Sequence, residues 1–298
     1  MVPKQILCAT DLATSGQEAC QLAGRLAELF QAELILVHAT DTTDWAPPTG
    51  PSSAAIAAMQ EQLQGANASA QKALHAQRAS FEERGIRVRC HLQHGRPWSA
   101  ILEAAKQDEA SLIVVGARPR EERSLLDRVI GSTAERVVRH ATSDVLVTTG
   151  DGPADWKGAK IVVAVDFSGT SLRALDIAVH ASNALTGSLH LLHIAPDPLE
   201  PEMGPEKYKE TQARLKSETE DALRALLKER GAEGNGYCRF GSPGPVVADL
   251  TAEIDADMIV LGSRGQSRFR GIMLGSTTER VLRRATIPVW VVRPESNA

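Results

Sequence analysis

Glycine residues in the C-terminal half of the chain have the spacing expected of a loop that holds a phosphate group. Gly262 and Gly265 follow the apolar run 258–261, and Gly275 and Ser276 come nine residues after Gly265, which gives the pattern G-x2-G-x9-G-S. Glycine lets a backbone approach an anion closely, and the first N–H groups of a helix point toward it unpaired. The pattern therefore predicts an anion-binding loop between a strand and a helix. It is not a P-loop, because no Lys-Ser or Lys-Thr pair follows its last glycine.

The segments around this loop alternate between apolar strands and amphipathic helices. In the C-terminal half we expect strands at 160–165, 188–194, 237–240, 257–262 and 288–292, and helices at 172–184, 203–230, 245–254 and 276–285. Near-continuous apolar strands between helices indicate a parallel sheet that is covered on both faces. Ligands bind such sheets beyond the carboxyl ends of the strands, where the strand order reverses. Asp166 and Gly262 lie at the carboxyl ends of the first and fourth strands, so both are expected to face one crevice.

The N-terminal half repeats this pattern. Residues 4–38 align with 159–193 without a gap, which pairs Asp11 with Asp166, and 131–147 matches 275–291 at eleven of seventeen positions. A turn-rich seam runs from 149 to 158. We therefore expect an α/β chain of two tandem, doubly wound, five-stranded parallel-sheet (Rossmann-like) domains, at 1–150 and 157–298. Their last strands would otherwise be exposed edges, so we expect the halves to pair there as a pseudo-twofold dimer within the chain.

The glycine loop of the N-terminal half is degenerate. It reads Gly116, then Pro119 in place of the second glycine, then eleven residues before Gly131. Proline lacks an N–H group and fixes φ, so one donor to a phosphate is lost. The inserted segment also contains three carboxylates that would repel a triphosphate, partly offset by three arginines: Glu121, Glu122 and Asp127 against Arg118, Arg120 and Arg123.

The bulk composition narrows the class of protein. With 298 residues, 43% hydrophobic residues and a net charge of −4, the chain is typical of a globular protein of two domains and has no basic surplus for nucleic acid. No apolar run approaches the roughly 20 residues of a membrane span, which argues against membrane insertion. The four cysteines have no CxxC spacing. The expected location is the cytoplasm.

These features together resemble the universal stress protein family in its tandem two-domain form. The resemblance covers nearly the whole chain and rests on Val-Asp-Phe-Ser at 165–168, the glycine signature, and the closing Ile-Pro-Val at 287–289. It implies a regulatory or protective role in the stress response. It also implies that the C-terminal domain binds ATP, with or without Mg²⁺, and hydrolyses it slowly at most. The residues implied at the adenosine end are Val165, Asp166 and Ile194, and those along the ribose and phosphates are Gly262, Arg264, Gly265, Gly275, Ser276 and Thr277.

Several of these residues also have a purely structural interpretation. Ser276 and Glu279 form a capping box, which would account for both without a ligand. Asp166 could be a turn or cap residue, a role that we assign to Asp11; the neighbouring glycine loop favours a ligand role for Asp166. His38 and His193 are interpreted as strand-end histidines.

Other signals point away from chemistry. The glycine-rich segment 231–236 precedes a strand and predicts a helix C-cap and turn. His91 and His94 lie on one expected strand without an acidic or cysteine partner nearby, so no metal site is predicted. No catalytic residues can be assembled from the sequence. Two alternatives remain: a scaffold without nucleotide that presents a surface to a protein or small apolar ligand, and a hydrolase of the related adenine-nucleotide group. The sequence leaves open whether two copies of the chain form a homodimer.

Overall fold

The computed structural model describes residues 2–41, 53–117, 131–149, 156–196, 204–265 and 274–295. The chain forms two compact units, of which one holds Pro3–Pro119 with Gly131–Thr148 and the other includes Thr149–Ala298. We call them the N-terminal and C-terminal units. The insertion at 118–130, on which the expectation of a degenerate loop rests, and the seam at 150–155 lie outside the described residues.

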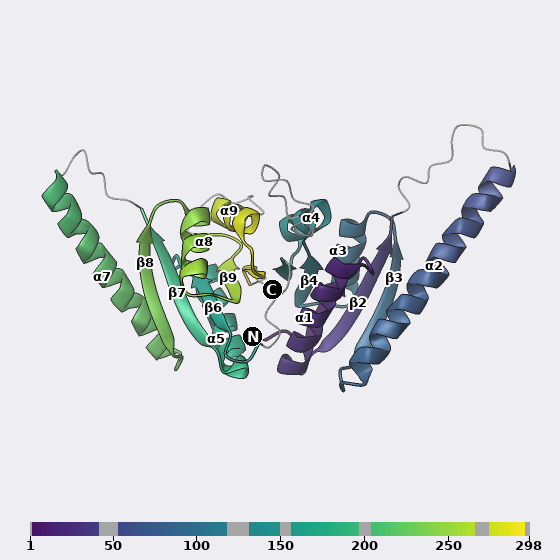
Figure 1. Ribbon diagram of the computed structural model, residues 1–298, viewed down its shortest axis with the longest axis horizontal. Coiled ribbons are helices and arrows are strands. Elements are labelled where there is room, and N and C mark those ends of the chain that lie inside the picture. The colour runs from purple at the N-terminus through teal and green to yellow at the C-terminus, as the bar shows by residue number, and fades with distance from the viewer. Residues whose placement is uncertain are drawn as a thin grey trace. The chain divides into compact units, whose positions relative to one another are not determined.

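The N-terminal unit alternates strands and helices along its length (Figure 1). Its strands are parallel and lie side by side in the order β3-β2-β1-β4-β5. The chain runs from β1 outward through β2 to β3. It then crosses to the other side of β1 and adds β4 and β5. Because such crossovers are right-handed, the first two helices cover one face and the last two cover the other. The elements are β1 Gln5–Ala9, α1 Thr14–Phe30, β2 Glu33–Thr40, α2 Ser53–Glu82, β3 Val88–His94, α3 Pro97–Gln107, β4 Leu112–Gly116, α4 Ser132–His140 and β5 Asp144–Thr148.

The C-terminal unit has the same topology. Its parallel strands follow the order β10-β9-β6-β7-β8, and the order reverses between β6 and β9. The prediction of an α/β chain with two tandem, doubly wound, five-stranded parallel sheets is confirmed. The elements are β6 Lys160–Ala164, α5 Gly169–Leu185, β7 Ser188–Ala195, α7 Pro205–Glu229, β8 Gly234–Phe240, α8 Pro243–Glu253, β9 Met258–Gly262, α9 Ser276–Arg284 and β10 Val289–Val292.

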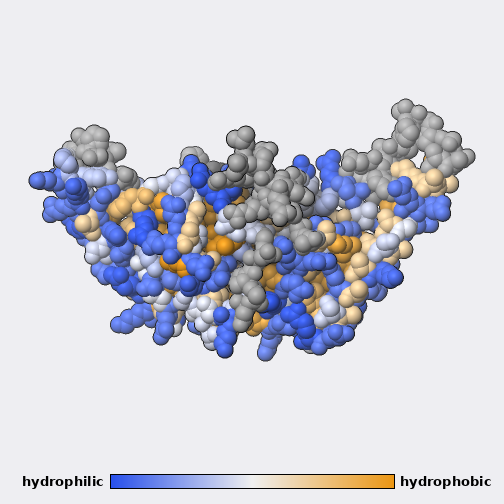
Figure 2. Space-filling model, viewed as in Figure 1, coloured by the Kyte–Doolittle hydropathy of each residue, from blue (hydrophilic) through white to orange (hydrophobic). Residues whose placement is uncertain are grey.

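Burial follows the apolar runs in the sequence. All four residues of β10 are buried, as are the three central residues of β6, because helices cover both faces of a parallel sheet. The outer helix α7 lies along β8 and buries only Leu223 and Leu227 among its 25 residues. Its remaining surface is rich in charged side chains, and the corresponding part of Figure 2 is mainly blue. Among the described helices, none has the length and apolar character that a membrane span requires.

The glycine-rich segment before β8 differs from the prediction of a turn over 231–236. Gly231, with φ of +61°, does follow α7, but Gly234 and Gly236 already belong to β8 and pair with β7. A Cβ on Gly236 would lie 2.7 Å from the Cβ of Leu223, and one on Gly234 would lie 2.0 Å from the carbonyl oxygen of Leu189. These glycines therefore allow β8 to pack closely against β7 and against α7, a constraint that strand propensity does not reveal.

Candidate functional site

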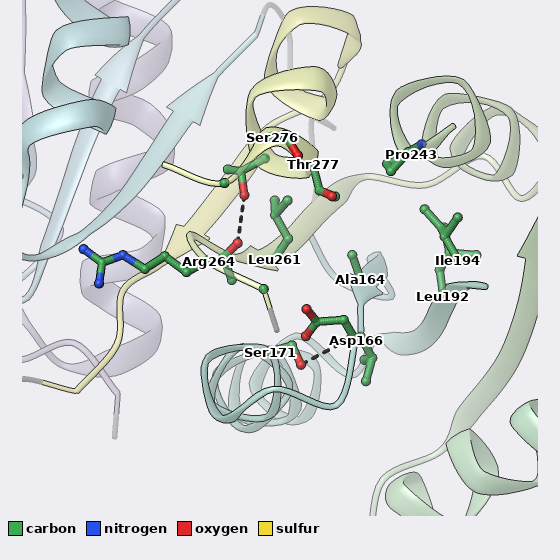
Figure 3. Close-up of a pocket in the computed structure, with 15 residues that line it drawn as sticks. Ala164, Asp166, Ser171, Leu192, Ile194, Pro243, Leu261, Arg264, Ser276 and Thr277 are labelled. Atoms are coloured by element: carbon green, nitrogen blue, oxygen red, sulfur yellow. Dashed lines mark hydrogen bonds between the residues drawn. The ribbon is translucent and has the colours of Figure 1, made fainter. Parts of the chain in front are cut away.

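A pocket of about 250 Å³ lies at the carboxyl ends of β6, β7 and β9, where the strand order of the C-terminal unit reverses (Figure 3). The nine residues implied by the resemblance all line it, and they are Val165, Asp166, Ile194, Gly262, Arg264, Gly265, Gly275, Ser276 and Thr277. The sequence analysis did not include six further lining residues, which are Ala164, Ser171, Leu192, Pro243, Leu261 and Thr278.

One end of the pocket is apolar. Figure 3 shows Leu192 and Ile194 on β7 together with Ala164 at the end of β6, and Pro243 at the start of α8 on the same side. We call these four residues the apolar end. A flat apolar surface beside a few polar groups is what small-molecule sites generally offer to an aromatic ring.

Asp166 lies beside the apolar end and is held by the turn that leads into α5. Its Oδ1 accepts a hydrogen bond from the N–H of Ser168 at 3.0 Å, and its own N–H donates to Oγ of Ser171 at 3.3 Å. A Cβ on Gly265 would lie 2.5 Å from Oδ2 of Asp166. The absence of a side chain at Gly265 therefore leaves room for the carboxylate at the pocket.

The other glycines of the signature bring the loop close to the sheet. The N–H of Gly275 donates to the carbonyl oxygen of Ser263 at 2.8 Å, so this amide closes the loop on itself. A Cβ on Gly262 would lie 3.0 Å from Cγ2 of Thr170 and 3.2 Å from the N of Ser171, which places the end of β9 tightly against the start of α5. The absence of a side chain at Gly262 and Gly275 thus lets the backbone of the loop pack closely against its neighbours.

The capping-box prediction at the start of α9 is wrong. The N-cap residue is Gly275, so Ser276 is the first helical residue. The helix begins too early for the hydroxyl of Ser276 to occupy the N-cap position that the box requires. The helix α4 begins in the same way, with Gly131 as its N-cap. Ser276 and Thr277 instead line the pocket (Figure 3).

The electrostatics of the pocket differ between its two sides. The start of α9 carries the partial positive charge of a helix N-terminus and N–H groups that have no intrahelical partner. Arg264, which is exposed, adds the one full positive charge among the described lining residues, and Asp166 adds the one carboxylate. The side formed by Arg264, Ser276 and Thr277 suits an anion.

His38 and His193 were predicted to end their strands, but β2 and β7 each continue for two more residues. Nδ1 of His38 lies 2.8 Å from the carbonyl oxygen of Thr10, and Nδ1 of His193 lies 2.7 Å from that of Val165. The His193 ring also packs against Phe167, with 5.2 Å between ring centroids. Both histidines therefore tie the second strand of a unit to the turn after its first strand.

His91 has an acidic partner that the sequence analysis missed. Its Nε2 lies 2.9 Å from Oδ2 of Asp108, which follows α3, and Asp108 also contacts Arg89. The two residues lie on β3 and at the end of the next element, α3, 17 positions apart, and the packing of the helix against the strand brings them together. Within the described parts of the chain, no cluster of three or more potential metal-ligating side chains occurs.

Some of the missed lining residues had a sequence signal. Pro243 belongs to Gly-Ser-Pro at 241–243, which corresponds to Gly-Arg-Pro at 95–97 in the repeat. Thr278 follows Thr277 directly and donates from Oγ1 to the carbonyl oxygen of Gly262 at 2.9 Å. Leu192 resembled every other apolar strand residue, so only the three-dimensional arrangement could single it out.

A crevice at the switch point of a doubly wound parallel sheet defines a class of ligand-binding α/β domains. The family model for universal stress proteins matches the chain twice, over residues 3–149 and 159–293. The chain therefore belongs to the universal stress protein family and is a tandem member of it. The expected resemblance is confirmed.

Individual relatives agree with this assignment. A universal stress protein of Mycolicibacterium smegmatis is 29% identical over 295 residues, which cover 97% of both chains. Universal stress protein YxiE of Bacillus subtilis is 30% identical over 150 residues, 45% of this chain and 98% of its own. The crystal structure of a universal stress protein from Archaeoglobus fulgidus covers 99% of this chain and 97% of its own, at a TM-score of 0.68 and 22% identity. The last comparison supports the fold.

Proposed function

We propose that the C-terminal unit binds ATP in the pocket at the ends of β6, β7 and β9. The observation that carries the proposal is that an apolar end, the Asp166 carboxylate and the N-terminus of α9 line one pocket. These are the three environments that an aromatic base, a ribose with its hydrogen-bond donors and a phosphate chain require. The sequence pattern and the family membership point to the same ligand.

Each end of the pocket has a separate task in this proposal. Ile194, Leu192 and Pro243 would cover the faces of adenine, and Asp166 would accept hydrogen bonds from the adenosine. The phosphates would lie near α9, where Ser276 and Thr277 supply hydroxyl groups and the helix supplies unpaired amides. Arg264 would add a counter-charge, and Mg²⁺ bound to the triphosphate would supply further neutralisation.

The proposed role is regulatory or protective in the stress response, in the cytoplasm, with an adenine nucleotide as the ligand. The presence of bound nucleotide would itself be the signal. Rapid hydrolysis would remove it, but catalysis of hydrolysis needs a base within reach of the attacking water. Asp166 is the carboxylate that lines the pocket, and it lies beside the apolar end. Hydrolysis is therefore expected to be slower than the ~1 s⁻¹ at the low end of enzyme turnover.

A single methyl group tests the proposal at its most constrained point. In Gly265→Ala the new Cβ would meet Oδ2 of Asp166 at 2.5 Å, and only the end of that side chain would have to move. We expect the variant to remain folded and to lose most of its affinity for ATP, measured by calorimetry. Gly65→Ala is the matched control, because a Cβ on Gly65 meets no atom within 4 Å.

The outcomes of this experiment separate the candidate functions. Loss of ATP binding in Gly265→Ala with unchanged binding in Gly65→Ala supports the nucleotide site. Unchanged ATP binding in both variants would place the nucleotide elsewhere. Absence of ATP binding by the wild type would favour the scaffold that presents a surface to a protein or small apolar ligand.

A further inference from the structure

Asp11 and Asp166 occupy equivalent positions in the two units, and Oδ1 of each accepts from the N–H two residues further on, that of Ala13 or Ser168. Their carboxylates differ in the next contact, because Asp11 also accepts from the N–H of Gly16, whereas the N–H of Ser171 donates to Ser168. Residues 4–38 align with 159–193 without a gap. The residue after each aspartate, Leu12 or Phe167, has a φ of +63°. The two backbones share this unusual conformation after the first strand, so side chains nearby must cause the difference.

In the N-terminal unit, Asp11 caps helix α1. Its Oδ1 accepts hydrogen bonds from the N–H of Ala13 at 2.9 Å and from that of Gly16 at 3.0 Å. Ala13 is the N-cap residue and has no side-chain oxygen, so the carboxylate supplies the acceptor that the first amides of a helix need. A Cβ on Gly16 would lie 2.4 Å from that same Oδ1. Glycine at this position is what admits the carboxylate.

In the C-terminal unit, two serines occupy the equivalent positions. Ser168 is the N-cap of α5, and its Oγ accepts from the N–H of Ser171 at 3.3 Å. Ser171 replaces Gly16, and its Cβ takes the space that the carboxylate occupies in the other unit. Its Oγ accepts from the N–H of Asp166 at 3.3 Å and donates to the carbonyl oxygen of Ser168 at 3.0 Å. The N–H of Ser171 is therefore capped by Ser168 and not by the carboxylate. Oδ1 of Asp166 accepts from the N–H of Ser168, and its Oδ2 lies beside Gly265.

We propose that Ser168 and Ser171 are positioning residues that turn Asp166 into the pocket, and that Ala13 and Gly16 instead hold the Asp11 carboxylate on the first amides of α1. Ser168 replaces the carboxylate as the cap, and Ser171 excludes the carboxylate from the cap position by size. This inference rests on the proposed function, because the pocket is where it assigns the adenosine. It adds a second difference between the halves, located after the first strand, at residues outside the glycine loop.

The direct test gives the C-terminal unit the residues of the N-terminal one. In the double variant Ser168→Ala with Ser171→Gly, Asp166 is expected to move onto the amide of residue 171. The affinity for ATP should fall about tenfold or more, as expected for a lost hydrogen bond to a charged group. Affinity for inorganic tripolyphosphate should not change, because Asp166 lies away from α9. A general loosening of the pocket would weaken both ligands.

Two further variants are matched to this one. Ser168→Asn retains a capping side chain and should keep the wild-type affinity for ATP. The reverse exchange in the N-terminal unit, Ala13→Ser with Gly16→Ser, makes the opposite change at the equivalent positions, which do not line the pocket, and should leave ATP affinity unchanged. Circular dichroism of every variant establishes that the fold is retained.

A crystal structure of the Ser168→Ala and Ser171→Gly variant gives a readout that does not depend on nucleotide. The inference is supported if the Asp166 carboxylate caps α5, and it is overturned if the carboxylate stays beside Gly265. Equal weakening of ATP and tripolyphosphate would also overturn it. If the wild type binds no ATP, the proposed function is wrong, and the carboxylate position alone then decides the inference.

Discussion

Oγ1 of Thr278 donates a hydrogen bond of 2.9 Å to the carbonyl oxygen of Gly262, which joins the first turn of α9 to the last residue of β9. Thr278 is buried, so its hydroxyl group has little access to water as an alternative partner. This bond spans the glycine loop and fixes the distance between its two ends. The equivalent residue in the N-terminal unit is Ala134, which has no hydroxyl to make the bond.

Replacing this threonine should therefore destabilise the C-terminal unit. We expect Thr278→Val, which keeps the shape but loses the donor, to lower the free energy of unfolding by about 0.5–1.5 kcal/mol. Urea denaturation measures the change. Ser276→Ala is the control, because Ser276 lines the pocket and does not cap α9, and it should cost less. A larger loss for Ser276→Ala would show that the serine supports the helix.

The two aspartates should respond in opposite ways to truncation. Asp11→Ala removes the cap of α1 and should cost about 1 kcal/mol of stability without affecting ATP affinity. Asp166→Ala should cost less stability, because Ser168 caps α5, and should weaken ATP binding about tenfold. Thermal unfolding and calorimetry on both variants check the pattern. Equal effects of the two variants on ATP affinity would contradict it.

His190 should make stability depend on pH. Burial, and then the charge of Lys160, lower the pKa of His190 below its ordinary value of 6.5. The unfolded chain therefore takes up the proton first as pH falls. The stabilisation is complete above about pH 6.5 and is lost as pH falls through the lower pKa of the folded state. His190→Asn should lose less stability than the wild type between pH 7.5 and about pH 5, as urea midpoints would show. Parallel profiles would contradict the assignment.

The pairing of the two halves remains a prediction. Apolar strands β5 and β10 end their units, and an exposed strand edge invites association. A separately expressed fragment from Trp156 to Ala298 should therefore self-associate, which sedimentation velocity would detect. A fragment that is folded and monomeric at high concentration would contradict intrachain pairing through these strands.

The fold was largely predictable from the sequence because the strands of both units are near-continuous apolar runs. The repeat located equivalent strands twice, and the position of Asp166 and Gly262 after two strands placed them in one crevice. The structure places the start of β8 at Gly234 and not at Tyr237, because close packing of Gly234 against β7 and of Gly236 against α7, rather than turn formation, explains those glycines. Local propensity cannot distinguish the two uses of glycine.

The residues of the site were predictable where a short sequence motif specifies them. They were not predictable where tertiary contacts or the exact start of a helix decide their role. The capping box was wrong because α9 begins one residue earlier than its serine suggests. The contact between His91 and Asp108 depends on packing between β3 and the end of α3, which no spacing encodes. The contrast between Ser168 and Ala13 was present in the sequence, yet its meaning required the direction of two carboxylates.

The stoichiometry of ATP binding to the full chain tests the central claim most directly. Isothermal titration calorimetry should give one ATP per chain, bound in the C-terminal unit, since the glycine signature is intact in that half alone. Gly265→Ala should remove most of the affinity of that single site. Two equal sites per chain, or none, would contradict the account.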